Sequence, residues 1–324
     1  MKNLSMPNHS ILLILLLLAA PLYAAKQLDS IVAVVNDDVI LKSELDETMK
    51  TAKQTLQARK MDLPPESVLQ QQVLGSLIIK QLQLAHAARM NLSIDDGLLN
   101  QAMENFARQQ GLKGLSELKK KQTARGVNWG QFREQFREEV LISELQGRII
   151  RQQVNVSQQE VDNYLASLQT QGQVSVEYHW AHILISPPQA ANSLQIDASR
   201  RQAESLQAEL QKGADFAKSA LTHSKGRNAL KGGDMGWAPV GQLPTLFSTV
   251  VPGLQAGQVS QVLRSPSGFH IVKLLEVRNN TRQGLSMEQL RNSVRSTLEK
   301  RKFDEQLEQW LLQTRDAAYV EIRL

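Results

Sequence analysis

The chain has 324 residues, of which 42% are hydrophobic and 21% are charged, and its net charge is +5. At this length it can bury more than one core, so we expect about two domains. It contains no cysteine, which excludes a disulfide framework, a thiolate nucleophile and a cysteine metal site. Its basic residues are spread among acidic ones, which argues against a nucleic-acid partner.

The first residues have the pattern of a signal peptide. Lys2 precedes an apolar run over residues 11–20, and small residues follow at Ala24 and Ala25. The run is shorter than the roughly 20 residues that a membrane-spanning helix needs, so an uncleaved anchor is the weaker interpretation. We expect residues 1–24 to be removed on export, with Ala24 or Ala25 before the cleavage site, and no integral membrane span afterwards.

The mature chain opens with a strand pattern and continues with a long helical region. Residues 31–35 and 39–41 are apolar and flank Asn36-Asp37-Asp38, which predicts two short strands about a turn. From residue 43 to about 168, apolar residues recur at helical spacing, as in the stripes Leu74, Leu77, Ile78, Leu82 and Trp129, Phe132, Phe136, Val140. Three patterns resemble capping boxes at helix starts: Ser43 with Asp46, Ser93 with Asp96, and Ser157 with Glu160. We therefore expect a helical domain over residues 25–172.

The hydrophobic period changes after Gly172, which indicates a second domain over residues 173–279. Its expected elements are a β-rich run, two helices, a Gly-rich loop, a short helix and a final strand, over 174–185, 198–211, 215–222, 232–236, 244–251 and 269–277. Strands separated by helices predict an α/β unit of about one hundred residues.

The helical pattern returns in residues 280–324. Ser286 with Gln289 predicts a helix start, an apolar stripe follows, and residues 319–324 alternate like a strand. A lone helix and strand cannot bury their apolar sides, so we expect them to pack on the N-terminal domain, with the last strand joining the first hairpin. The predicted fold class is α+β, a helical module with one α/β domain inserted into it.

Three motifs within the inserted unit stand out together: Trp180-Ala181-His182-Ile183-Leu184, Gly232-Gly233-Asp234-Met235-Gly236-Trp237, and Ser265-Pro266-Ser267-Gly268-Phe269-His270-Ile271. In this order and spacing they resemble the parvulin family of peptidyl-prolyl cis-trans isomerases. The flanking segments 31–44, the helices up to Arg151 and 301–324 are similar to the SurA-type periplasmic chaperones. The resemblance covers nearly the whole mature chain and implies a periplasmic location.

The parvulin resemblance implies a site made of two facing histidines, two hydroxyls and several apolar substrate-binding side chains. In this sequence these are His182 and His270, Ser265 and Ser267, and Met235, Leu243, Phe247, Trp237 and Phe269. The alternative is that the histidines and the apolar residues simply belong to a core. Isomerising a prolyl bond means lowering a barrier of about 18–20 kcal/mol set by amide resonance, which needs placed donors and a grip on the ring. The resemblance therefore implies no cofactor and no covalent step.

Other catalytic classes find little support in the sequence. His179 and His182 have the spacing of a metal pair, but on a strand this spacing directs them to opposite faces, so we expect no metal. We find no Gly-x-Ser-x-Gly elbow, phosphate loop or dinucleotide fingerprint.

One loop departs from the pattern of active parvulins, which usually carry Cys or Asp two residues after a Ser. Here Ser224 is followed by Lys225 and Gly226, so the resemblance implies a low turnover. The leading hypothesis is a chaperone that binds unfolded outer-membrane β-barrel proteins and Pro-containing or aromatic-rich peptides, with isomerase activity. The alternative is a catalytically silent parvulin unit that serves only for peptide binding or as a spacer.

Overall fold

The computed structural model describes residues 29–171, 176–188, 190–279 and 286–324. The expected signal peptide over residues 1–24 lies outside these ranges. Within the described ranges, no helix is both long and apolar enough to cross a bilayer.

A three-stranded sheet joins the two ends of the described chain. Strands β1 (Ile31–Val35) and β2 (Asp38–Leu41) form the predicted hairpin, and β7 (Val320–Ile322) pairs antiparallel with β1. Asn36 adopts a positive φ of 52° in the turn, where asparagine is well tolerated. Its side chain accepts from the N–H of Tyr319, and its own N–H donates to the Tyr319 carbonyl, both at 2.9 Å. The prediction that the last strand joins the first hairpin is confirmed.

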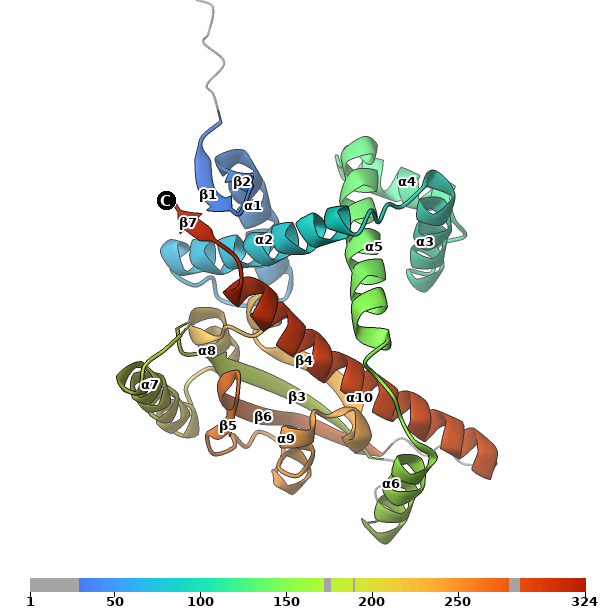
Figure 1. Cartoon of the computed structure of the whole chain (residues 1–324), viewed down its shortest axis with the longest axis vertical. Helices are drawn as coiled ribbons and strands as arrows, with labels where there is room; N and C mark the ends of the chain where they lie inside the picture. The colour runs from blue at the N-terminus through green and yellow to red at the C-terminus, as the bar shows by residue number, and fades with distance from the viewer. Residues whose placement is uncertain (1–28, 172–175, 189, 280–285) are drawn as a thin grey trace, which may run out of the picture.

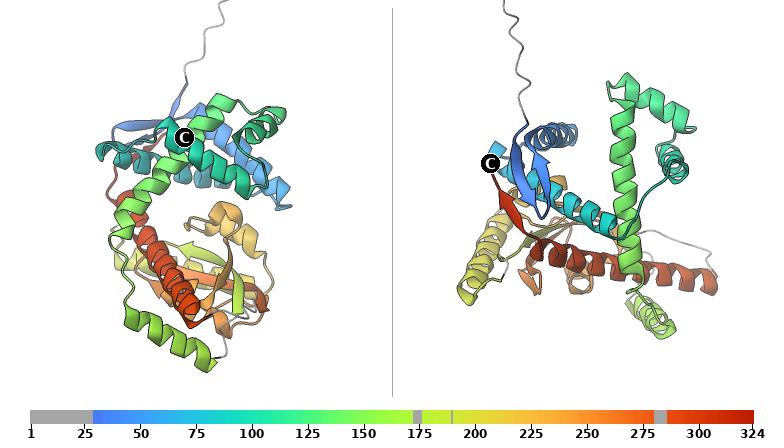
Figure 2. Two further views of the ribbon diagram at one scale, coloured as in Figure 1. Left: turned by 90° about the vertical axis from the view of Figure 1, so that its right-hand side faces the viewer. Right: turned by 45° about the horizontal axis from the view of Figure 1, so that its top comes forward.

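The N-terminal helices form two apolar clusters. The hairpin, α1 and α2 share a core that includes the predicted stripe Leu74, Leu77, Ile78 and Leu82. A second cluster lies between α3, α4 and α5, where the aromatic stripe of α5 is partly buried. Figure 2 shows α3 and α4 beside one end of α5, away from the larger sheet. The helices are α1 (Lys42–Ala58), α2 (Glu66–Arg89), α3 (Asp96–Gln109), α4 (Leu115–Ala124), α5 (Trp129–Arg151) and α6 (Gln158–Gln171).

Helix starts follow the predicted capping boxes in part. Boxes at Ser157 and Ser286 begin α6 and α10 (Met287–Asp316) as predicted. At α1 the prediction is wrong, because β2 runs directly into the helix and Ser43 lies inside its first turn, bonded to Asp29. At α3 the cap is Asp95 instead of the predicted serine. Its carboxylate accepts from the backbone N–H of the third residue of the helix at 2.8 Å.

A four-stranded antiparallel sheet, in the order β4-β3-β6-β5, forms the inserted unit. One face packs Ala181 and Ile183 against the helices α7 and α8, and the other packs Tyr178 and Trp180 against the segment that carries Leu243. The elements are β3 (Val176–Ile185), α7 (Ser193–Gln211), α8 (Phe216–His223), η1 (Ala229–Lys231), β4 (Asp234–Pro239), η2 (Val240–Gln242), α9 (Thr245–Ser248), η3 (Val251–Gly253), β5 (Leu263–Ser265) and β6 (Gly268–Asn279).

Helix α10 runs between the upper helices and this sheet (Figure 1). Val294 and Leu298, in its first half, join the same core as Trp180. In its second half, Trp310 meets His86 of α2 edge to face, with ring centroids 5.7 Å apart. The C-terminal segment therefore packs on the inserted unit as well as on the N-terminal helices, which the prediction did not include.

The inserted unit is also docked on the N-terminal module through α8. Leu221 of α8 is buried in the core formed by α1, α2 and the hairpin. Gln72 of α2 donates to the carbonyl of Ser224 at 2.9 Å. The unit is therefore held by side-chain contacts along its length and not only by the two chain crossings at its ends.

Helices α6 and α10 both approach the inserted unit closely at Gly241. A β-carbon there would overlap the Tyr164 hydroxyl and lie 2.8 Å from Cγ2 of Thr297. We expect Gly241→Ala to lower the free energy of unfolding by about 1–3 kcal/mol, because a buried overlap forces the helices apart. Urea unfolding would measure this. The matched control is Gly75→Ala on the exposed face of α2, where an added β-carbon meets no atom within 4 Å. Equal midpoint shifts for the two variants would contradict the prediction.

Candidate active site

The structure brings the two predicted histidines into direct contact. His182 lies on β3 and His270 on the neighbouring strand β6. Nε2 of His182 is 2.8 Å from Nδ1 of His270, and the two rings are nearly parallel at 16°. Only 8% of His182 and 3% of His270 is exposed. The pair therefore forms a buried polar floor on the sheet face that also carries Trp180.

The two predicted hydroxyls extend this contact into a chain. Oγ of Ser265 is 2.6 Å from Nε2 of His270 and 2.9 Å from Oγ of Ser267. The backbone N–H of Ser267 also donates to the Ser265 hydroxyl at 3.0 Å. The β5–β6 hairpin produces this geometry, because Ser265 pairs with Gly268 on either side of a two-residue turn.

Burial keeps both imidazoles neutral. It lowers the pKa of His270 from 6.5 to about 4. Burial, followed by the charges of His270 and Arg227, lowers the pKa of His182 well below 6.5. A neutral imidazole has one donor and one acceptor nitrogen. The hydrogen bonds that join Ser265, His270 and His182 can therefore run in either direction. Either Ser265 donates to His270 and His270 to His182, or each of these bonds is reversed.

Apolar side chains cover the imidazole pair. The Phe247 ring centroid is 5.1 Å from that of His182, 5.5 Å from that of His270 and 5.3 Å from that of Trp180. Leu243 is fully buried and Phe247 is 4% exposed, both in the same core. Met235 packs at the edge of this core, and its sulfur accepts from Nδ2 of Asn228 at 3.2 Å.

Two residues predicted for substrate binding lie elsewhere. Trp237 pairs with His179 across β3 and β4, their rings stack 5.2 Å apart, and the Arg278 guanidinium lies 4.2 Å from the Trp237 ring. Phe269 packs with Ile183 in the core on the opposite face of the sheet from His270. The cause is strand alternation, since neighbouring residues on a strand point to opposite faces. Both residues belong to the motifs, but neither reaches the imidazole pair.

Sequence reasoning missed two contributors to the site. Trp180 shares the sheet face of His182 because it lies two residues earlier on β3, a signal that the sequence did contain. Ser224 is fully buried, and its hydroxyl accepts from the N–H groups of Leu184 and Gly226, both at 3.1 Å. A β-carbon on Gly226 would lie 3.7 Å from Nδ1 of His182, so this loop borders the pair directly.

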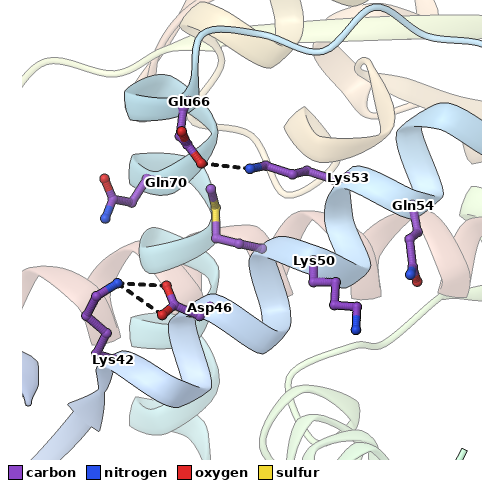
Figure 3. Close-up of a pocket in the computed structure, with 8 residues that line it drawn as sticks. Lys42, Asp46, Lys50, Lys53, Gln54, Glu66 and Gln70 are labelled. Carbon is purple, nitrogen blue, oxygen red and sulfur yellow. Dashed lines mark hydrogen bonds and ion pairs between the residues drawn. The ribbon is translucent and has the colours of Figure 1, made fainter. Parts of the chain in front are cut away.

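A separate pocket of about 580 Å³ lies between α1 and α2 (Figure 3). Lys42 points toward Asp46, and Lys53 points toward Glu66, with N–O distances of 2.8 and 2.7 Å. These ion pairs already neutralise most of the charge that lines the pocket. None of the residues predicted for the site contributes to it.

The low pKa of His270 predicts an acid-sensitive fold. Between pH 6.5 and about 4 the unfolded chain binds a proton on this histidine that the folded chain does not, so stability falls as the pH falls. We expect a contribution of about 1.4 kcal/mol per pH unit across this window, present in the wild type and absent in His270→Asn. Urea unfolding from pH 7 to 4 measures both proteins, and the shared carboxyl groups cancel in the difference. Parallel pH profiles would contradict the assignment.

The family comparisons match both parts of the chain. Residues 28–146 match the family model of the SurA N-terminal domain, and residues 182–276 match that of the PPIC-type PPIase (rotamase) domain. A protein named Chaperone SurA from Nitrosococcus oceani is 46% identical over 263 residues, which cover 81% of this chain and 62% of that protein. Its namesake from Pseudomonas aeruginosa is 42% identical over 255 residues, covering 79% and 61%. The chain thus spans about three-fifths of the length of these curated relatives.

One solved structure with similarity to the chain is a PpiC-type peptidyl-prolyl cis-trans isomerase domain, which is 26% identical. The match covers 34% of this chain and 99% of the solved domain, with a TM-score of 0.31. Another is from a Campylobacter jejuni study of PEB4 and Cj1289, described as SurA-like chaperones. It is 15% identical and covers 91% of this chain and 99% of that one, with a TM-score of 0.43. The chain therefore carries a SurA N-terminal domain followed by a PPIC-type rotamase domain, and over about four-fifths of its own length it is similar to proteins named Chaperone SurA.

Proposed function

We propose that this chain is a periplasmic chaperone that holds unfolded outer-membrane β-barrel proteins and carries a prolyl-isomerase site at His182 and His270. The observation that supports the isomerase part is the continuous contact from Ser265 through His270 to His182 beneath Phe247. The holding part is supported by relatives that are themselves named as chaperones.

The proposed isomerase chemistry needs no covalent step. Phe247 and Leu243 would grip the proline ring, and the imide would twist above the neutral imidazole pair. In a buried site, donors aimed at the twisted imide stabilise it more strongly than water does. Because the two imidazoles and Ser265 can reverse their proton order, the floor can donate to or accept from the bound peptide without taking up a charge.

The proposed holding surface is the cluster of α3, α4 and α5. Trp129, Phe132 and Phe136 form a ladder with Phe106, with successive ring centroids 5.4 to 6.2 Å apart, and these aromatic rings are partly buried. They serve as core on one side and offer apolar surface on the other. Unfolded β-barrel chains carry alternating apolar residues and unpaired strand edges, which such a surface would shield from aggregation.

The alternative is a silent isomerase unit that only binds peptides or acts as a spacer. Two observations favour low turnover. The resemblance to parvulins implies the first, since the loop after Ser224 has neither the Cys nor the Asp that active parvulins usually carry. Two of the three residues of the proposed ring pocket, Leu243 and Phe247, are almost wholly buried in this conformation, while Met235 is partly buried. Holding and catalysis therefore have to be measured separately.

Two assays on one sample of the mature chain separate these functions. We expect wild type to suppress light scattering by a diluted, unfolded porin and to accelerate proline-limited refolding weakly. His270→Ala and Phe247→Ala should each reduce the isomerase rate by about tenfold or more, because each removes part of the site, while holding stays unchanged.

The control for these variants is His179→Ala, since His179 bonds Asp234 at 2.9 Å and stacks on Trp237 instead of joining the pair. It should leave both assays unchanged. Absence of any acceleration by wild type would leave the silent alternative, and undiminished scattering would refute the holding function.

The loop departure can be tested by restoring a carboxylate. Gly226 has an ordinary backbone conformation, and its β-carbon would lie 3.7 Å from Nδ1 of His182 and 3.3 Å from Oγ of Ser224, so that the Ser224 hydroxyl has to shift slightly in any variant. We expect Gly226→Asp to raise the isomerase rate severalfold and to raise the pKa of His182, because an opposite charge nearby favours the protonated ring. The matched control is Gly226→Asn, which has the same shape without the charge. Equal rates for the two variants would contradict a role for the carboxylate.

A further inference from the structure

Helix α10 packs alongside the segment that carries the proposed proline-ring residues. Thr297 approaches the backbone at Gly241, Nζ of Lys300 donates to the Gln242 side chain at 3.4 Å, and Oε1 of Glu305 accepts from the N–H of Thr245 at 2.6 Å. These contacts come from three residues of α10 that are spread over about two turns of the helix. The C-terminal helix therefore lies along residues 241–245, immediately before Phe247.

The short helix α9 receives a hydrogen-bond acceptor from α10. It contains four residues and follows Pro244, whose side chain has no oxygen to cap it. The N–H groups of Phe247 and Ser248 bond the Pro244 carbonyl at 2.8 and 2.9 Å. The N–H of Thr245 is left over at the helix start, and Glu305 satisfies it. A single turn has little stability of its own, so this bond matters for where Phe247 lies.

The neighbouring residue on α10 reaches the opposite side of the site. Oδ1 of Asp304 is 3.1 Å from Nη2 of Arg227, which follows Gly226 in the loop beside His182. The charge of Arg227 contributes to lowering the pKa of His182. Two consecutive acidic residues thus connect α10 to both loops that flank the imidazole pair.

We propose that Glu305 is a positioning residue of the isomerase site. By accepting from Thr245 it fixes α9, and so it sets the Phe247 ring against His182 and His270. The helix that closes the SurA-type module would then also complete the site of the inserted unit. This inference rests on the proposed isomerase function, and it adds that the site depends on a residue outside the segment that matches the rotamase family model.

Steady-state isomerase kinetics on a proline-containing peptide test the proposal in the full mature chain. We expect Glu305→Ala to raise KM about fivefold with kcat nearly unchanged, because the displaced ring weakens binding of the proline. Glu305→Gln keeps an acceptor oxygen and should retain wild-type kinetics. The control is Glu299→Ala, an exposed position on the same helix. Wild-type KM in Glu305→Ala, or an equal rise in Glu299→Ala, would overturn the proposal.

A second readout does not require catalysis. The Phe247 ring lies close enough to both imidazoles to shift their Cε1–H proton resonances by its ring current. Glu305→Ala should move both resonances and Glu305→Gln should not. If wild type shows no turnover, the isomerase function fails while this measurement still decides the positioning role. Unchanged resonances in Glu305→Ala would refute that role.

Thr245→Pro removes the same hydrogen bond from its donor side, so it serves as a second variant in case Glu305→Ala fails to fold. Proline is tolerated at the first position of a helix, and it removes only the N–H that Glu305 accepts. We expect the same change of KM and the same resonance shifts as in Glu305→Ala, with no further effect in the double variant. Additive effects of the two substitutions would contradict a shared hydrogen bond.

Discussion

The architecture depends on one helix that packs on two separate parts of the structure, the inserted unit and α2. Val294 and Leu298 bury the first half of α10 against the four-stranded sheet, while Trp310 meets His86 of α2 in the second half. The chain then continues into β7, whose pairing with β1 fixes the end of the helix. Because the two halves of α10 pack on different partners, α10 helps to fix the orientation of the inserted unit relative to the N-terminal helices.

The same helix shapes the electrostatics of the imidazole pair. The histidines are neutral because they are buried, and a neutral pair can pass hydrogen bonds in either direction. Asp304 pairs with Arg227 in the loop beside His182, and burial raises the pKa of Glu308 on the same helix. Charges that belong to the chaperone-like body therefore border a site that belongs to the rotamase unit.

Strand alternation explains which of the motif residues lie together and which lie apart. His182 and His270 lie on one face of neighbouring strands, as the family pattern implied, and Leu243 and Phe247 cover them. Phe269 follows the opposite parity on β6, so its closeness to His270 in sequence places it in the other core. A motif shows which residues lie close together in the sequence. Which of their side chains are in contact depends on the alternation of side chains between the two faces of the sheet.

By itself, the sequence determined the secondary-structure periods, the change of pattern near Gly172 and the hairpin at the start, while the histidine pair with its hydroxyls was implied by the resemblance to parvulins. Each of these follows from local spacing or from motifs that the chain contains. Only the tertiary structure decided that α10 packs on both the inserted unit and α2, that Gly241 must lack a side chain, and that Glu305 reaches Thr245. Contacts between residues far apart in sequence leave no periodic signal, because they depend on how whole elements pack.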